Sequence, residues 1–156
     1  MSSWKQQALI EAPVEEVWAL LVDPVRYPEW SSDVVKVTGA PARIEVGSTL
    51  DITNRGPLGI KSTTPFRVEE LEDLRQIKMQ CQVSGFYTHW VLTEARGNTF
   101  TEVELGVEPM RGLQARAAAA IHTKGYLRRA VDGMVDGLRR AVGRRPTRSK
   151  GASNPE

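Results

Sequence analysis

The sequence predicts an α+β domain in which a strongly curved antiparallel sheet of about seven strands wraps around one long C-terminal helix. Hydrophobic residues alternate with a period of two between about residues 33 and 107, which is typical of strands with one buried face. Residues 113–142 instead follow a helical period of 3.6. A sheet with one apolar face must be covered, and this last helix is the only large cover available.

Length and composition favour a single soluble domain. The 156 residues suffice for one hydrophobic core, and 40% hydrophobic with 26% charged residues is typical of globular chains. No apolar run approaches the roughly 20 residues that span a bilayer, and the N-terminus lacks the apolar core of a signal peptide. The single cysteine, Cys81, excludes an internal disulfide and a multi-cysteine zinc site. We therefore expect a cytoplasmic protein with no cofactor and no metal.

The net charge of +2 comes from the C-terminal segment. Residues 143–156 contain four basic residues and one acidic residue, so residues 1–142 sum to −1. A domain without excess positive charge is not typical of nucleic-acid binding. We expect a ligand-binding domain over residues 1–142, a basic disordered tail over 143–156, and no nucleic-acid partner.

The first elements are predicted from apolar spacing and from proline. Alternation over residues 4–10 indicates a strand. Helical spacing follows over residues 14–22, with Pro13 before it and Glu15 and Glu16 in its first turn. Asp23-Pro24 ends this helix, and a short helical turn over residues 25–30 follows.

Three two-residue turns predict the register of the central strands: Glu72-Asp73, Ser84-Gly85 and Gly97-Asn98. They place one apolar set on one face: Phe66, Val68, Ile77, Met79, Cys81, Trp90, Leu92, Val103 and Leu105. The opposite, solvent-facing set is Arg67, Glu69, Gln76, Lys78, Gln80, His89, Thr93, Glu102 and Glu104. The apolar face is extended by Leu50, Ile52, Val35 and Val37.

The C-terminal helix is predicted to be continuous, about 42 Å long at 1.5 Å per residue. Its apolar stripe is Leu113, Ala117, Ala120, Leu127, Val131, Met134, Val135, Leu138 and Val142. Gly143 is expected to end it. Four alanines, 117–120, would leave a space between this helix and the sheet, and the larger side chains further along would seal that space.

The stretch EAPVEEVWALLVDPVRYPEW, residues 11–30, carries a more specific pattern: Ala12-Pro13, Val17-Trp18, Asp23 and Trp30. Together with Gly47, the hairpin from Trp90 to Thr101 and the last helix, it resembles the START-like (SRPBCC) superfamily, in its polyketide cyclase/dehydrase and lipid-transport branch. The resemblance covers about residues 4–142. It implies a helix-grip fold of the START/Bet v 1 type, enclosing an apolar cavity for lipids, polyketides, sterols or hormones. It does not imply one activity, because such a fold hosts both enzymes and binding proteins.

Lys124 is the main anomaly of the predicted stripe. A lone buried ammonium is costly unless it is paired or loses its proton. Either Lys124 faces the cavity and meets an acidic or carbonyl group of a ligand, or its stem crosses apolar surface and its charge reaches solvent. Trp90 either stacks on a planar ligand or packs in the core. Cys81 and Thr88 form a small polar pair on the same face, and the absence of a histidine from that face argues against a cysteine nucleophile.

The remaining polar candidates are expected to lie outside the cavity. His89 points to the wet face, and His122 and Tyr126 lie on the outer side of the helix. Aromatase/cyclases of the resembled family carry a cavity arginine, and Arg67 is the nearest match. The predicted pairing turns Arg67 outward, although a bulge near Pro65 would turn it inward. The loop 54–59 either gates the cavity or is an ordinary hairpin connection.

These observations predict a protein that binds an apolar polyketide, lipid or other polycyclic or acyl ligand. The predicted ligand-binding residues are Phe66, Met79, Cys81, Thr88, Trp90, Leu105 and Lys124. The alternative is a polyketide aromatase/cyclase or dehydrase acting in the same cavity, and a third possibility is a partner-binding module using the tail or the outer sheet. We expect a monomer or a weak homodimer.

Overall fold

The computed structural model describes residues 3–56, 58–108 and 112–142. The predicted helix end at Gly143 and the basic segment 143–156 lie outside the described residues. In chain order the elements are β1 (Ser3–Ile10), α1 (Val14–Leu21), the short 3-10 helix η1 (Pro24–Arg26), α2 (Tyr27–Trp30), β2 (Val34–Thr38), β3 (Thr49–Arg55), β4 (Lys61–Glu72), β5 (Gln76–Cys81), β6 (Phe86–Ala95), β7 (Asn98–Val107), α3 (Leu113–Ile121) and α4 (Lys124–Ala141).

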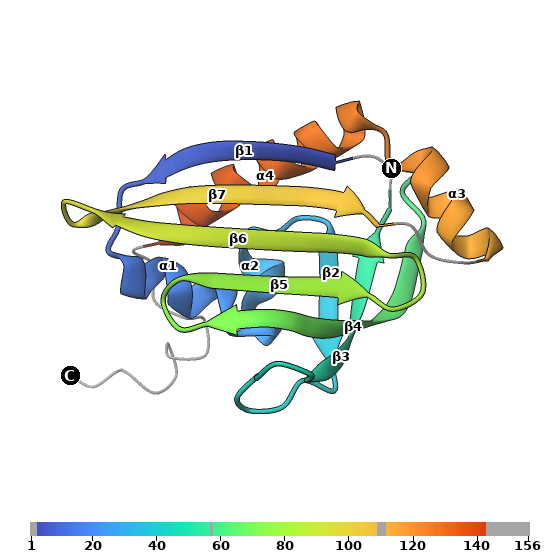
Figure 1. Cartoon of the computed structure of the whole chain (residues 1–156), viewed down its shortest axis with the longest axis horizontal. Coiled ribbons are helices and arrows are strands. Elements are labelled where there is room, and N and C mark those ends of the chain that lie inside the picture. The colour runs from blue at the N-terminus through green and yellow to red at the C-terminus, as the bar shows by residue number, and fades with distance from the viewer. Residues whose placement is uncertain (1–2, 57, 109–111, 143–156) are drawn as a thin grey trace, which may run out of the picture.

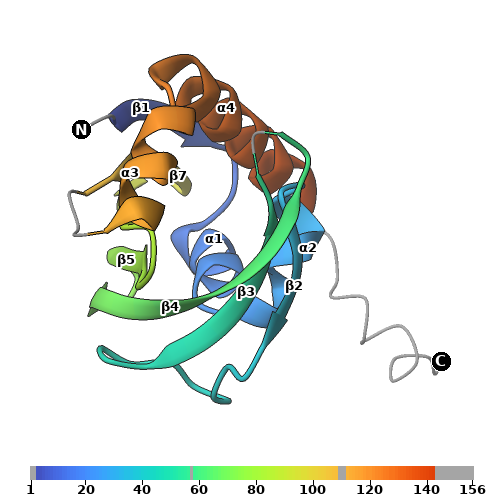
Figure 2. The same cartoon turned by 90° about the vertical axis from the view of Figure 1, so that its right-hand side faces the viewer.

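The seven strands form one antiparallel sheet in the order β1-β7-β6-β5-β4-β3-β2. The sheet curls, with α1, α2 and α4 on its concave side and α3 at one end (Figures 1 and 2). The α+β helix-grip architecture predicted from the sequence is confirmed. Each helix in the described part of the chain is too short or too polar to span a bilayer.

The apolar face of the sheet is the predicted one, and all nine of its predicted central residues are buried. The pairing differs from the predicted register in all three hairpins. Thr88 pairs with Met79 and not with Cys81, and Val68 pairs with Met79 and not with Ile77. Between β6 and β7 the pairs differ by two residues, because the turn lies at Arg96-Gly97 and not at Gly97-Asn98. Both turn residues have positive φ, 55° and 82°. Trp90 therefore pairs with Val103 and not with Leu105. A shift of two residues keeps every side chain on its face.

Two irregularities decide which residues of β2 and β4 face inward. In β4 the register shifts between Val68 and Glu70, so Val68 is buried in the core and Leu71 packs against it. Because this bulge lies beyond Arg67, it leaves that side chain exposed and beside Glu69. The prediction for Val35 is wrong, because the register of β2 shifts between Val34 and Lys36, and Val34 packs against the core in its place.

The prediction of one continuous C-terminal helix is also wrong. α3 ends at Ile121, and α4 begins at Lys124. Between them, Thr123 has an extended backbone, and its hydroxyl accepts a hydrogen bond of 3.2 Å from the Tyr126 backbone N–H. Threonine is a favoured N-cap residue, so this bond starts a second helix. The break changes the direction of the chain and the face that each following residue presents (Figure 1).

α4 closes the core over β1 and β7. Its buried large side chains are Leu127, Val131, Val135 and Leu138. Polar contacts at its edge join it to β1: the Gln6 amide donates to Asp132 at 2.9 Å, and the Arg139 guanidinium donates to the Leu9 carbonyl at 3.1 Å. The space between α4 and the sheet is therefore filled with side chains, as predicted for the C-terminal part of the last helix, which is rich in leucine, methionine and valine.

Candidate functional site

A cavity of about 420 Å³ lies between the concave face of the sheet and the C-terminal helices. This volume falls in the range of about 300–1,000 Å³ that is usual for small-molecule sites. Its walls come from strands β2 to β7, from α2 and from both C-terminal helices. Ala117 and Ala118 of α3 border it, so the predicted space beside the alanine run is present.

Aromatic side chains close the inner end of the cavity. The rings of Trp30 and Trp90 meet edge to face, with centroids 5.7 Å apart and an interplanar angle of 87°. Tyr27 lies edge-on to Trp30 at 5.3 Å, and its hydroxyl donates to the Leu21 carbonyl at 2.7 Å. Such aromatic pairs are rigid and apolar. The three aromatic rings therefore form a rigid end wall against which the apolar part of a ligand could pack.

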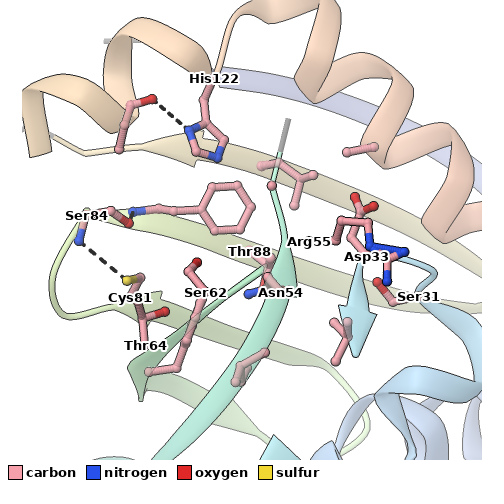
Figure 3. A pocket seen from close by; sticks show the side chains of 18 of the residues that line it. Ser31, Asp33, Asn54, Arg55, Ser62, Thr64, Cys81, Ser84, Thr88 and His122 are labelled. Atoms are coloured by element: carbon pink, nitrogen blue, oxygen red, sulfur yellow. Dashed lines mark hydrogen bonds between the residues drawn. The ribbon is translucent and has the colours of Figure 1, made fainter. Parts of the chain in front are cut away.

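One polar patch surrounds Cys81 on strands β4 to β6. The Cys81 sulfur accepts a hydrogen bond from the Ser84 backbone N–H at 3.4 Å, and Ser62, Thr64 and Thr88 lie nearby on the same wall (Figure 3). Burial raises the pKa of the thiol, but hydrogen bonds from Ser84 and Thr64 outweigh it, so the pKa lies below its usual value. The patch offers hydroxyl groups and one thiol to a ligand.

A second polar patch lies where β2, β3 and α4 meet, and it contains the only carboxylate that lines the cavity within the described chain. Asp33 is half-buried with Arg55 and Ser31 beside it (Figure 3), and it interacts with the Tyr126 hydroxyl. Burial raises the pKa of Asp33 above its usual value, although the Tyr126 hydrogen bond and the Arg55 charge lower it. The pKa of Tyr126 rises to about 12, by burial and by the adjacent Asp33 charge.

His122 enters the cavity wall at the break between α3 and α4. Its Nδ1 lies 2.7 Å from the Ala118 carbonyl oxygen, which fixes Nδ1 as the protonated nitrogen and leaves Nε2 as an acceptor. Phe86 and Tyr126 flank the ring, with centroids at 5.1 and 5.4 Å. Burial lowers the pKa of His122, although the Ala118 bond raises it, so the ring is neutral at pH 7. It presents a neutral base to the cavity (Figure 3).

Six of the seven predicted ligand-binding residues line the cavity: Phe66, Met79, Cys81, Thr88, Trp90 and Leu105. Lys124 does not. It is exposed at the first position of α4, because the helix break moves it out of the stripe in which a continuous helix would place it.

The same break overturns the prediction that His122 and Tyr126 face outward, because both line the cavity. Asp33 was not predicted as a cavity residue, and Arg55 was predicted only as part of the loop 54–59 that could gate the cavity. Thr123, followed by Gly125, is the sequence signal that could have indicated the break, since threonine favours N-caps and glycine weakens helices. His89 lies on the outer face of the sheet, as predicted, and its Nε2 is 2.9 Å from the Gln76 side-chain oxygen Oε1.

The cavity is open at the end where α3 and the β3–β4 connection lie. Asn54 and Arg55 at the end of β3, and Gly56, Leu58 and Ile60 after it, all line the cavity, so four described residues of the predicted loop 54–59 border the mouth. No cluster of three or more histidine, cysteine, aspartate or glutamate side chains suited to a metal ion occurs in the described ranges. The arrangement is that of an apolar pocket with a few polar groups on its walls.

The fold and the cavity define a START-like protein of the helix-grip class. Residues 1–143 match the model of the family described as polyketide cyclase / dehydrase and lipid transport, and the chain belongs to this family. No curated protein sequence matches the chain significantly.

Solved structures with the same fold share little sequence with it. A START superfamily protein from Mycobacterium smegmatis superposes with a TM-score of 0.69 at 16% identity, covering 90% of this chain and 96% of that one. The Zhui aromatase/cyclase from Streptomyces sp. R1128 superposes with a TM-score of 0.68 at 14% sequence identity, covering 92% of this chain and 94% of that one. An AHSA1-like protein from Aeromonas hydrophila superposes with a TM-score of 0.65 at 18% sequence identity, covering 99% of this chain and 98% of that one. These likenesses establish the fold.

Proposed function

We propose that the protein binds an apolar small molecule of the polyketide, lipid or other polycyclic or acyl class in this cavity. The observation that carries the proposal is the 420 Å³ space itself, walled mainly by apolar side chains and carrying polar groups at a few positions. Sites that bind small molecules have this composition, in which the apolar wall provides affinity and the polar groups provide orientation.

The walls suggest how a ligand lies. Its apolar body would contact Phe66, Met79, Trp90 and Leu105. Hydroxyl or carbonyl groups of the ligand would meet Thr88 and Cys81 on the sheet side. On the helix side they would meet His122 and the Asp33–Tyr126 pair, whereas Lys124 lies outside the cavity lining.

Native mass spectrometry of the freshly purified chain tests this proposal. We expect a mass above that of the polypeptide, with the excess lost on denaturation and recovered in an organic extract. N-phenyl-1-naphthylamine, a neutral apolar fluorophore, provides a second readout that requires no knowledge of the natural ligand. A chain that carries no extra mass and does not enhance the fluorescence of this probe contradicts the proposal.

A second candidate function is a polyketide cyclase or dehydrase, and the position of His122 favours it. His122 lines the cavity, and its Nε2 is a neutral acceptor, which is the state that a general base requires. The base would take a proton from a carbon between two carbonyls, the resulting enolate carbon would attack a third carbonyl, and the imidazolium would return its proton to the alkoxide formed. The neutral imidazole would then take the second proton of the same carbon and pass it to the departing hydroxyl, which leaves as water as the carbon–carbon double bond forms. The Zhui aromatase/cyclase has a similar fold, which is compatible with this chemistry.

The enzyme proposal is tested with a soluble poly-β-ketone thioester and mass detection of the loss of water. We expect His122→Phe to abolish the reaction while retaining the probe's binding, and His89→Phe, on the outer face, to leave both unchanged. Equal product formation by the wild type and by His122→Phe would falsify a role for this base.

A further inference from the structure

Three large apolar side chains at the mouth of the cavity are exposed to solvent. Leu58 is 74% exposed, Ile60 66% and Ile121 42%, and all three also line the cavity. They come from the β3–β4 connection and from the end of α3, which lie at the same end of the molecule (Figures 1 and 2). Apolar side chains gathered around an opening are a typical mark of an interaction site.

The two segments that carry these side chains are basic and contain no acidic residue. Residues 52–68 and 112–131 lack aspartate and glutamate altogether. Lys61, Arg116 and Lys124 are exposed. Within the described part of the chain, none of the three forms an ion pair. Arg55 is also at this end, with its charge partly balanced by Asp33.

Other exposed apolar residues share this setting only in part or not at all. Leu113, 82% exposed, is in the same basic segment but does not line the cavity. Val25, 59% exposed, lies between Asp23 and Glu29 in the sequence, and Val46, 58% exposed, follows Glu45. Neither lines the cavity. Val46 precedes β3, whereas the mouth lies beyond its other end. The combination of exposed apolar side chains, positive charge and an opening therefore distinguishes the mouth.

We propose that the mouth docks on an anionic lipid bilayer, with Leu58, Ile60 and Ile121 inserted at the boundary between headgroups and acyl chains. Leucine and isoleucine flanked by lysine and arginine suit this boundary, because burial of the apolar side chains and attraction to anionic lipids add together. Each basic residue near an anionic surface strengthens binding about five-fold. An apolar ligand could then pass between the bilayer and the cavity without crossing water.

Sedimentation of the full chain with vesicles tests the docking site, and it does not depend on knowing the ligand. We expect binding to phosphatidylcholine vesicles that contain phosphatidylglycerol, little binding to phosphatidylcholine alone, and weaker binding as salt rises, because ions screen the attraction. Leu58→Asp combined with Ile60→Asp should reduce the binding at least ten-fold. Val25→Asp combined with Val46→Asp, which makes the same change of charge at sites away from the mouth, should not.

A second pair of variants tests the charges. Lys61→Ala with Lys124→Ala should weaken binding by more than ten-fold, whereas Lys36→Ala with Arg43→Ala, also exposed, should reduce it by much less. All variants carry the same segment 143–156, so a difference within a pair arises at the mouth. Failure of the wild type to sediment with anionic vesicles at low salt overturns the proposal, and so does an equal loss in the matched pairs. Either outcome leaves the ligand-binding proposal standing, because the apolar probe measures that separately.

Discussion

The backbone of Gly137 lies directly against the carbonyl group of Trp30. A Cβ atom at position 137 would overlap with the Trp30 carbonyl oxygen, so only glycine fits there. The contact joins α4 to α2, and Trp30 in turn packs edge-on against Trp90 at the inner end of the cavity. One glycine thus allows the close approach that holds the aromatic end of the cavity in place.

Gly137→Ala should lower the free energy of unfolding by about 1–3 kcal/mol, because the added methyl group forces two backbones apart. Gly133→Ala, on the same helix, is the matched control. A Cβ there meets nothing within 4 Å, so the substitution should stabilise the protein by about 0.5–1 kcal/mol through helix propensity. Urea denaturation measures both, and a Gly137→Ala protein as stable as the wild type would contradict the contact.

Ala118→Phe should close much of the cavity without destabilising the fold. Ala118 is buried and lines the cavity, so a phenyl ring there extends into existing space. We expect the affinity for N-phenyl-1-naphthylamine to fall at least ten-fold. Ala120→Phe adds the same ring at an exposed position that does not line the cavity, and its affinity should not change. Equal effects of the two substitutions would place the probe elsewhere.

Leu127→Ala should cost more stability than Leu105→Ala. Both side chains are fully buried, but only Leu105 borders the cavity. Leu127 is surrounded by packed atoms, and its truncation should cost about 2–5 kcal/mol. Leu105 already faces empty space on one side, so it loses fewer contacts. Guanidinium denaturation of the two variants should give this order, and the reverse order would mean that the cavity wall is elsewhere.

The imidazole of His122 should titrate below its ordinary pKa of 6.5 in the folded protein. The folded state then binds fewer protons than the unfolded state, so stability is lost as the pH falls below about 6.5. Nitrogen-15 NMR should detect a neutral ring with its proton on Nδ1 at pH 7, and His122→Gln should remove this part of the acid sensitivity. A ring protonated on Nε2 at pH 7 would contradict the hydrogen bond to Ala118.

The faces of the sheet were predictable because side-chain alternation tolerates errors in the turns. Placing the β6–β7 turn at Gly97-Asn98 moved each pair by two residues, which left Trp90 and Leu105 on the same face as before. The bulge of β4 could not be derived from spacing. It depends on burying both Val68 and Leu71, which a regular strand would place on opposite faces.

The polar groups of the cavity were less predictable than its apolar walls. A single N-cap bond at Thr123 separates α3 from α4 and turns His122 and Tyr126 inward. The spacing of apolar residues does not indicate this break, because Leu127 and the apolar residues after it keep the spacing of one continuous helix. Asp33 and Arg55 come together by folding of the distant β2 and β3, which no local pattern indicates.

The break at Thr123 also divides the C-terminal helical segment into α3 and α4, which differ in how firmly they pack against the rest of the domain. Among the described side chains of α3 only Ala118 is buried, whereas α4 buries a continuous row of leucines and valines. We therefore expect α3 to detach locally while the main core remains intact. The residence time of a bound ligand would then depend on how long α3 stays packed against the rest of the domain. Substitutions that stabilise α4 would leave this residence time unchanged.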